Sequence, residues 1–186
     1  MFLLILGIVI WSAAHFLPAT DAYKRKKIMA KVGVIPYKIG FALTIIGSMV
    51  LMVVGWRSIT PVYLYALPEW VKYITYLFVL ITFILFAAAR SKTNIKRILR
   101  HPQLTGLVFW AFGHLLVNGD SRSLILFAGM LVWAKIQIIL TNKRDGKREL
   151  PASVPVQNDV LTVILGTVAF VGFAFAHRYI TGVALF

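Results

Sequence analysis

Long apolar stretches with few or no charged residues recur along the chain. A bilayer core of about 30 Å is crossed by about 20 mostly apolar helical residues, so each stretch is a candidate transmembrane helix. We expect six spans, at Phe2–Ala19, Ile39–Trp56, Val71–Ala89, Leu104–Val117, Ser123–Leu140 and Val160–His177. The fourth is short, and helix geometry can extend it from His101 to Asn118. The pattern predicts an all-α, polytopic membrane helical bundle in which residues 1–186 form a single domain.

The connections between these spans carry their positive charges unevenly. Most of the 20 Lys and Arg residues follow the first, third and fifth spans, in clusters such as Lys24–Lys27. Because cytoplasmic loops are enriched in Lys and Arg, these three connections should be cytoplasmic and both termini non-cytoplasmic. The first span precedes its basic cluster, which is the reverse of the charge order in a secretory signal peptide. We therefore expect it to be retained as a membrane helix.

Composition supports a membrane protein and excludes several other classes. The chain is 60% hydrophobic and 14% charged, whereas soluble domains are about 45–50% apolar and about 25% charged. It has no cysteine, which excludes a disulfide scaffold and a Cys-ligated zinc site. The net charge of +14 is explained by loops that set topology and contact anionic lipid headgroups. No nucleic-acid-binding module is recognised, so we expect no nucleic-acid partner.

Four histidines are the clearest polar candidates in the predicted spans. Helix arithmetic places His15 in the inner third of the bilayer and His101 at its cytoplasmic surface, with His114 and His177 near the outer side. Imidazole is a common ligand of transition metals and of haem iron. Each histidine could instead hydrogen-bond a neighbouring helix. Small residues that would let a flat macrocycle approach are Gly40, Gly47, Ser48, Gly113 and Gly129.

One face of the fourth span gathers further polar groups. Trp110, His114 and Asn118 recur at i, i+4 and i+8, so they share a helix face. The segment continues into Gly119 and Asp120, a strong turn signal. Asp120 either caps the turn into the fifth span or takes part in a site. A simple apolar span would need none of these groups.

These residues resemble the signature of a known family. The segments that carry it are Arg100-His101-Pro102-Gln103-Leu104, Gly106, Trp110-Ala111, His114-Leu115-Leu116 and Asn118-Gly119-Asp120. They resemble the NnrU family of bacterial membrane proteins, and His15 also fits that pattern. The resemblance implies a multi-pass protein of the bacterial inner membrane with a role in nitrite and nitric oxide metabolism during denitrification.

The family is related to zeta-carotene isomerase, a membrane enzyme that uses b-type haem to isomerise a cis double bond. This relationship implies a haem site in which His15 matches one iron ligand, while His101 and His114 match two further histidines. The isomerase takes its other ligand from the helix corresponding to the fifth span, where this chain has Phe127-Ala128-Gly129-Met130. His114 or Met130 would have to substitute there. From depth alone, His15 pairs with His101.

The predicted cofactor site therefore combines His15 of the first span with several residues in and around the fourth span. Arg100, Lys96 or Arg97 would pair with haem propionates, because guanidinium and ammonium groups complement carboxylates. The candidate metal ligands are His15, His101 and His114. The full set of candidate cofactor-binding residues is His15, His101, His114, Arg100, Trp110, Asn118 and Asp120.

Two alternatives stay open. Arg100-His101-Pro102 with Gly106 resembles the Arg-His-Pro-x-Tyr-x-Gly element of membrane isoprenylcysteine and phospholipid methyltransferases, which implies S-adenosylmethionine binding. Leu104 occupies the tyrosine position, and Asp145 and Glu149 would supply the carboxylates of that site. The second alternative is a non-catalytic assembly factor that contacts another membrane protein through its spans.

The topology can be tested with reporter fusions. An alkaline phosphatase fused after Phe186 should be active, because the charge distribution places the C-terminus outside the cytoplasm. The same enzyme fused after Gly146, in the third basic connection, should be inactive and serves as the control. The reverse pattern of the two activities would contradict the assigned orientation.

Overall fold

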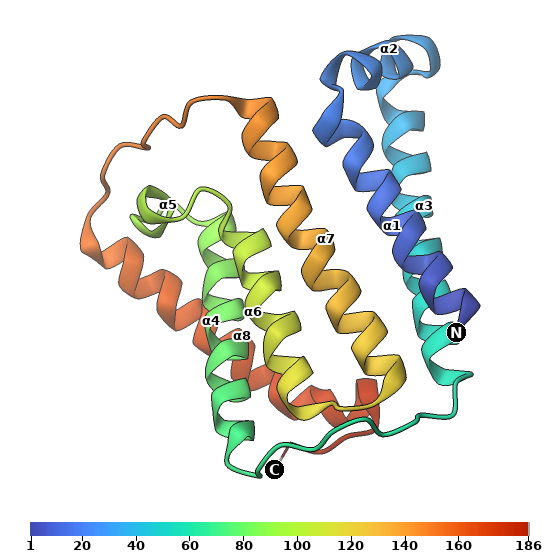
Figure 1. Cartoon of the computed structure of the whole chain (residues 1–186). Helices are drawn as coiled ribbons and strands as arrows, with labels where there is room; N and C mark the ends of the chain where they lie inside the picture. Colours follow the sequence, from blue (N-terminus) through green and yellow to red (C-terminus); the bar gives the residue numbers. More distant parts are fainter. Residues whose placement is uncertain (186) are drawn as a thin grey trace. The chain divides into compact units, whose positions relative to one another are not determined.

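The computed structural model describes residues 1–185, and every regular element in that range is a helix (Figure 1). The helices are α1 Phe2–Thr20, α2 Ala22–Val32, α3 Val34–Arg57, α4 Val71–Arg90, α5 Ile95–Ile98, α6 Pro102–Val117, α7 Ser121–Asp145 and α8 Val156–Thr181. Five of them, α1, α3, α4, α7 and α8, are long and apolar enough to cross a membrane. The predicted all-α membrane bundle is confirmed.

The fourth predicted span, Leu104–Val117, corresponds to the shorter apolar helix α6. It has 16 residues, so at a rise of 1.5 Å per residue it is about 24 Å long, below the thickness of about 30 Å of a bilayer core. Its first residue is Pro102, as expected for a residue whose missing N–H costs nothing in the first helical turn. Its end at Val117 confirms the turn predicted at Asn118-Gly119-Asp120.

The described helices form two compact units. Unit 1 comprises Met1–Leu67 and His114–Lys147, and unit 2 comprises residues 68–113 and the chain from Arg148 onward. The boundary falls within α6, so His114 and the last turn of that helix belong to unit 1. The single domain expected from the sequence stays a prediction.

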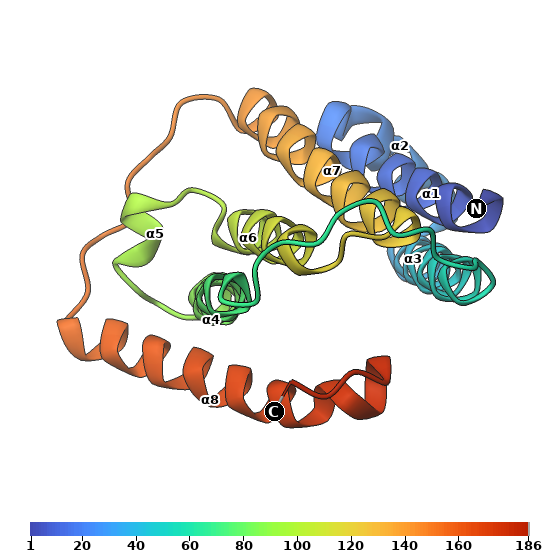
Figure 2. The ribbon, with the colours of Figure 1, turned by 60° about the horizontal axis from the view of Figure 1, so that its bottom comes forward.

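In unit 1, α1 packs against α3 and α7, and it lies beside both helices in Figures 1 and 2. The backbones of α1 and α3 approach closely at two glycines. A Cβ on Gly55 would overlap the backbone nitrogen of Leu4, and one on Gly7 would lie 2.7 Å from the carbonyl oxygen of Ser48. Any side chain would therefore separate these helices.

In unit 2, α4 packs against α8 and is hydrogen-bonded to α6. Thr75 and Thr82, seven residues apart on α4, donate hydrogen bonds of 2.9 Å to the carbonyl oxygens of Gly113 and Gly106 on α6. Such hydroxyl bonds and small residues are typical of helix contacts in membranes. On the α8 side, a Cβ on Gly166 would lie 2.5 Å from the Cα of Ile84.

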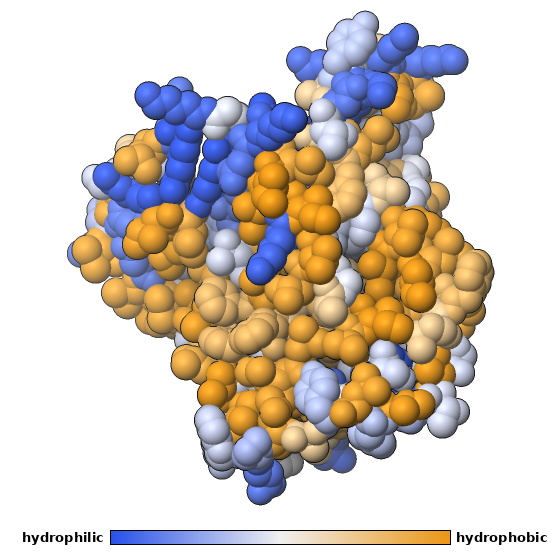
Figure 3. Space-filling model, in the orientation of Figure 1, coloured by the Kyte–Doolittle hydropathy of each residue, from blue (hydrophilic) through white to orange (hydrophobic). Residues whose placement is uncertain are grey.

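The helix sides expose large apolar side chains. Leu43 on α3 is 64% exposed and Val168 on α8 is likewise 64% exposed. Figure 3 shows hydrophobic residues over the helix sides and hydrophilic residues gathered at helix ends. Soluble monomers rarely expose such extensive apolar surface. This distribution is that of helices embedded in a lipid bilayer.

The first basic connection is more ordered than the sequence indicates. We expected a polar loop there, but residues 22–32 form the helix α2. Asp21 begins this helix, because its carboxylate accepts a hydrogen bond of 2.8 Å from the Lys24 backbone N–H, which also holds the pKa of Asp21 below its ordinary value. The apolar pattern missed α2 because the helix buries no side chain.

The α1–α3 contact predicts contrasting effects of two Gly→Ala substitutions on one helix. In Gly55→Ala the added methyl would meet the α1 backbone, and such overpacking costs about 1–3 kcal/mol. We expect its unfolding temperature in detergent to fall by roughly 5 °C. Gly47 has open space around it, so Gly47→Ala should leave that temperature unchanged or slightly raised. Equal effects of the two variants would contradict the close approach.

Candidate functional site

His15 lies in an aromatic cluster within unit 1. Its ring centroid is 4.5 Å from that of Trp11, one turn earlier on α1, and 5.1 Å from that of Trp133 on α7. Phe41 of α3 completes the cluster at 5.5 Å. The cluster forms because α1 packs between α3 and α7, so each neighbour supplies one ring. We call these four residues the His15 cluster.

The hydrogen bonding of His15 fixes the role of each ring nitrogen. Nδ1 lies 2.8 Å from the carbonyl oxygen of Trp11, and a carbonyl can only accept, so Nδ1 carries the proton. In the neutral ring the lone pair then lies on Nε2. This is the arrangement that metal-ligating histidines generally have, with one nitrogen bound to a protein acceptor and the other facing the metal.

The two tryptophan rings that contact this imidazole carry buried polar atoms without a partner. The indole nitrogens of Trp11 and Trp133 are buried and make no hydrogen bond with any residue that the structure describes. An unsatisfied buried polar group costs about 1–3 kcal/mol. The two indole N–H groups are therefore available to a polar group of a bound molecule. The sequence showed the spacing of Trp11 and His15, but it gave no indication that Trp133 joins them.

His114 occupies a different level of unit 1. Its ring packs against Phe127 of α7, with centroids 4.7 Å apart. Phe127 precedes Trp133 by six residues, so His114 and His15 contact α7 at points about 9 Å apart along its axis. Two side chains that hold one metal ion must lie close together, and the structure places these two histidines at different levels. No group of three or more His, Asp or Glu residues in the described part of the chain could hold a metal ion.

The other two histidines belong to unit 2. His177 lies near the end of α8, where its Nδ1 is 2.9 Å from the Val183 carbonyl oxygen and 3.1 Å from the Thr181 hydroxyl. This polar contact within the C-terminal segment accounts for its presence in an apolar helix. His101 immediately precedes α6 and lines a pocket described below.

The Asn118-Gly119-Asp120 segment holds the turn between α6 and α7. The Gly119 carbonyl oxygen accepts hydrogen bonds from the backbone N–H groups of Leu64 and Tyr65, at 2.7 and 3.2 Å. A Cβ on Gly119 would overlap the Tyr65 carbonyl oxygen, so only glycine fits. The Asn118 amide donates to the His114 carbonyl oxygen. The turn thus docks the segment after α3 onto the start of α7.

Asp120 caps α7. Its carboxylate accepts hydrogen bonds from the backbone N–H groups of Arg122 and Ser123, both at 3.1 Å, and from the Ser123 hydroxyl at 2.6 Å. Burial alone would raise the pKa of Asp120, but these hydrogen bonds from Ser123 and the nearby Arg122 charge hold it below its ordinary value. The cap therefore stays ionised at neutral pH. A role of Asn118 and Asp120 in cofactor binding stays a prediction.

The small residues that were predicted to let a macrocycle approach lie either in open space or at helix contacts. Gly40 and Gly47 have no atom within 4 Å of an added Cβ, while Ser48 is buried against Gly7. Gly113 packs on Phe78 and Gly129 on Ile8. These last positions serve helix contacts within each unit. Trp110, one turn before His114, is partly buried on α6.

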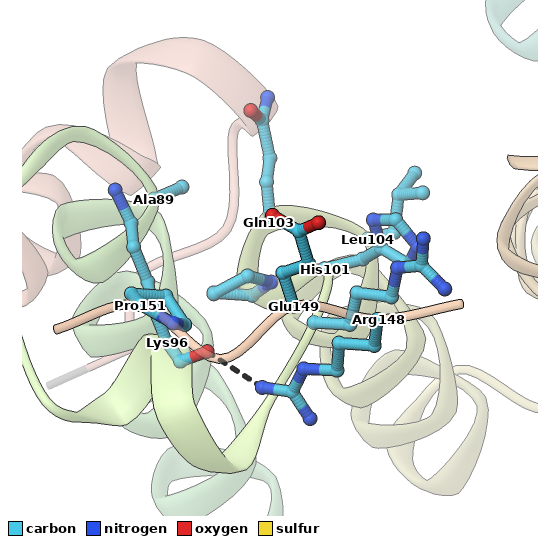
Figure 4. A pocket seen from close by; sticks show the side chains of 10 residues that line it. Ala89, Lys96, His101, Gln103, Leu104, Arg148, Glu149 and Pro151 are labelled. Carbon is cyan, nitrogen blue, oxygen red and sulfur yellow. Dashed lines mark hydrogen bonds between the residues drawn. The ribbon is translucent and has the colours of Figure 1, made fainter. Parts of the chain in front are cut away.

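A pocket of about 440 Å³ opens at the basic end of unit 2 (Figure 4). It lies among the end of α4, α5, the start of α6 and the segment after Lys147. Its polar lining residues are Lys96, Arg100, His101, Gln103, Arg148 and Glu149. We call it the rim pocket. It brings Glu149 to the adjacent residues Arg100 and His101, which lie on a separate segment of the sequence.

Arg148 fastens one wall of the rim pocket. Its guanidinium donates hydrogen bonds of 3.1 Å to the Ile98 carbonyl oxygen and 2.6 Å to the Lys96 carbonyl oxygen, the latter drawn in Figure 4. These bonds attach the segment after α7 to α5. From the sequence, Arg148 was assigned only to a basic connection that sets the membrane orientation. Nothing in the sequence reveals that its side chain bonds to residues about fifty positions earlier.

The comparisons with known proteins agree with this architecture. A family model described as NnrU protein matches residues 3–185. Neither the curated proteins nor the solved structures contain a match. The family match covers nearly every residue of both units, including α1 with His15 and α6 with both of its flanking motifs. The chain is thus a helical membrane protein that belongs to the NnrU family.

Proposed function

We propose that this NnrU-family protein binds b-type haem through Nε2 of His15 and supports nitrite and nitric oxide metabolism, or a haem-dependent redox isomerisation. The observation that carries the proposal is the hydrogen bond between His15 Nδ1 and the Trp11 carbonyl oxygen. It orients the imidazole and leaves the lone pair of Nε2 for a metal. Imidazole is also an established protein ligand of haem iron.

The surroundings of His15 fit a haem group chemically. Haem is a flat apolar ring with two carboxylates, and the His15 cluster offers aromatic side chains together with two buried, unpartnered indole donors. Those donors would hydrogen-bond to a carboxylate or another polar group of the bound molecule. Aromatic walls with a few placed polar groups are typical of cofactor sites.

Bound haem would supply a redox-active iron, whose potential depends on its ligands and on the polarity around it. The protein's own residues would hold that iron and exclude water. His15 is the first ligand in this proposal. Within unit 1, His114 contacts α7 at a different level from His15, so Met130, which is buried on α7 one turn before Trp133, is the candidate for the second position.

We further propose that the protein resides in the bacterial inner membrane, with its basic connections on anionic lipid headgroups. Five helices of spanning length support a multi-pass arrangement, and the clusters of Lys and Arg at helix ends support contact with anionic lipid. A membrane-protein partner that receives or donates electrons would contact the exposed apolar helix sides.

The haem proposal is tested with histidine variants purified in detergent from haem-replete cells. The wild-type protein should show a Soret absorption band, and His15→Ala should lower the haem content per protein at least about tenfold, because the ligand is lost. His177→Ala is the matched control and should retain haem, since that ring belongs to unit 2 and is hydrogen-bonded within the C-terminal segment. Haem-free wild-type protein, or a Soret band undiminished in folded His15→Ala, would overturn the proposal.

The indole donors give a second prediction. Trp133→Phe keeps an aromatic ring beside His15 but removes one buried donor, so we expect haem affinity to fall about five- to tenfold. Trp56→Phe is the control, because the Trp56 indole nitrogen is also buried without a partner. The Trp56 ring lies outside the His15 cluster, and the guanidinium carbon of Arg122 is 3.7 Å from its centroid. Haem titration of the apoproteins measures both affinities. An equal loss in the two variants would argue against a donor role for Trp133.

A further inference from the structure

We propose that the rim pocket binds a doubly charged phosphate group. That group would be presented by the phosphomonoester headgroup of a membrane lipid or by a small soluble phosphate. The proposal concerns unit 2 alone and does not depend on haem binding at His15. It rests on the charge and size of the pocket, on the hydrogen-bonded guanidinium of Arg148, and on the first turn of α6, which forms part of the wall.

The charges that line the rim pocket favour a dianion. Lys96, Arg100 and Arg148 are cations, and Glu149 is the one carboxylate among the lining residues. A group with two negative charges would balance this excess. The side chain of Lys96 makes no hydrogen bond or ion pair with any other residue that the structure describes, so its ammonium is available to an anion. Glu149 is exposed and can turn toward water.

The geometry of Arg148 prepares it for phosphate. Its bonds to the Ile98 and Lys96 carbonyl oxygens hold the guanidinium in one orientation. A guanidinium has five N–H donors in a planar fork, so two bonds to the protein leave donors for a ligand. Arginine binds phosphate through such paired donors and loses little freedom when it is already held.

The start of α6 adds a further attraction for anions. Pro102 and Leu104 line the pocket, so the first turn of this 16-residue helix forms part of its wall. Backbone N–H groups in a first helical turn have no partner within the helix, and the helix dipole favours negative charge there. The volume of about 440 Å³ also exceeds what a single water needs and accommodates a phosphate with its substituent.

The pocket's position favours a membrane lipid as one source of the phosphate. It lies at the end of α4 and the start of α6, where the charge pattern predicts the cytoplasmic headgroup layer. Basic pockets at this level bind lipid phosphates. S-adenosylmethionine, which the Arg100-His101-Pro102 motif suggests, would place a sulfonium cation among three cations. The charge balance therefore favours phosphate.

The proposal can be tested by thermal unfolding of the full-length protein in detergent. The probes are dihexanoyl phosphatidic acid, inorganic phosphate, dihexanoyl phosphatidylserine, dihexanoyl phosphatidylcholine and S-adenosylmethionine. We expect phosphatidic acid to raise the unfolding temperature in a saturable manner and to do so more strongly than phosphatidylserine, which has the same chains but a smaller net charge. Phosphatidylcholine should have no effect. A parallel shift with inorganic phosphate would identify a soluble phosphate as a sufficient ligand, whereas its absence would assign the site to lipid.

Two variants from one basic segment localise the binding. Lys96→Gln should raise the dissociation constant of phosphatidic acid about tenfold, because one charged donor is removed. Lys92→Gln makes the same charge change at an exposed residue outside the pocket and should leave the constant unchanged. His15→Ala should also leave it unchanged, which separates this result from the fate of the haem proposal.

Three results would overturn the phosphate site. The first is the absence of a shift with either phosphate probe in the wild-type protein, a measurement that requires no variant to fold. The second is an equal loss of affinity in Lys96→Gln and Lys92→Gln, which would indicate diffuse surface charge. The third is a shift with S-adenosylmethionine alone, which would assign the pocket to a methyl donor.

Discussion

The close approach of helix backbones at small residues is the constraint on which the rest of the structure depends. Between helices in lipid, apolar burial gives little net attraction, so packing contacts and interhelical hydrogen bonds must hold the helices together. Here Gly7 and Gly55 let α1 and α3 touch backbone to backbone, and Gly166 does the same for α8 against α4. Thr75 and Thr82 add hydrogen bonds to the carbonyl oxygens of two α6 glycines.

This packing also determines what surrounds His15. Gly129 lets α7 approach Ile8 of α1, and Trp133 follows Gly129 by one helical turn. The same approach therefore brings the Trp133 indole onto the ring of His15, whose own Trp11 is one turn back on α1. The faces of α1 and α7 that pack closely at Gly129 are therefore also the faces that enclose the His15 imidazole. Gly129 influences the site by setting the distance between these two helices.

The sequence predicted the parts of this structure that depend on hydropathy and turn chemistry. The apolar stretches located the spanning helices, Pro102 located the start of α6, and Asn118-Gly119-Asp120 located its end. It could not predict contacts between distant segments, because periodicity within a helix does not reveal which neighbour a face meets. Trp133 beside His15 and the bonds from Arg148 to residues 96 and 98 are of this kind. The helix α2 was not predicted because it is polar and has no buried face.

The motif that carries the family resemblance, residues 100–120, covers the shorter apolar helix α6 and both of its ends. The polar residues of this motif at the two helix ends have a physical reason. At about 24 Å, α6 is shorter than a bilayer core of about 30 Å, so its ends lie closer to the hydrocarbon than those of the longer spans. Polar groups at such ends must be satisfied by protein or reach outward to water. At one end the long side chains of Lys96 and Arg100 can extend to the headgroups while their stems stay in apolar surroundings.

At the other end of α6 the polar groups satisfy one another. The Asn118 amide bonds to the His114 carbonyl oxygen, the Gly119 carbonyl oxygen accepts two backbone N–H groups, and Asp120 closes the first turn of α7. Tyr65 donates from its hydroxyl to the Leu115 carbonyl oxygen, which covers another unpaired acceptor of the last helical turn. A span as short as α6 therefore requires polar residues at both ends for stability. The pocket cations at one end of α6, and His15 with the unpartnered indoles of Trp11 and Trp133, exceed this requirement, and these are the residues to which our proposals assign ligands.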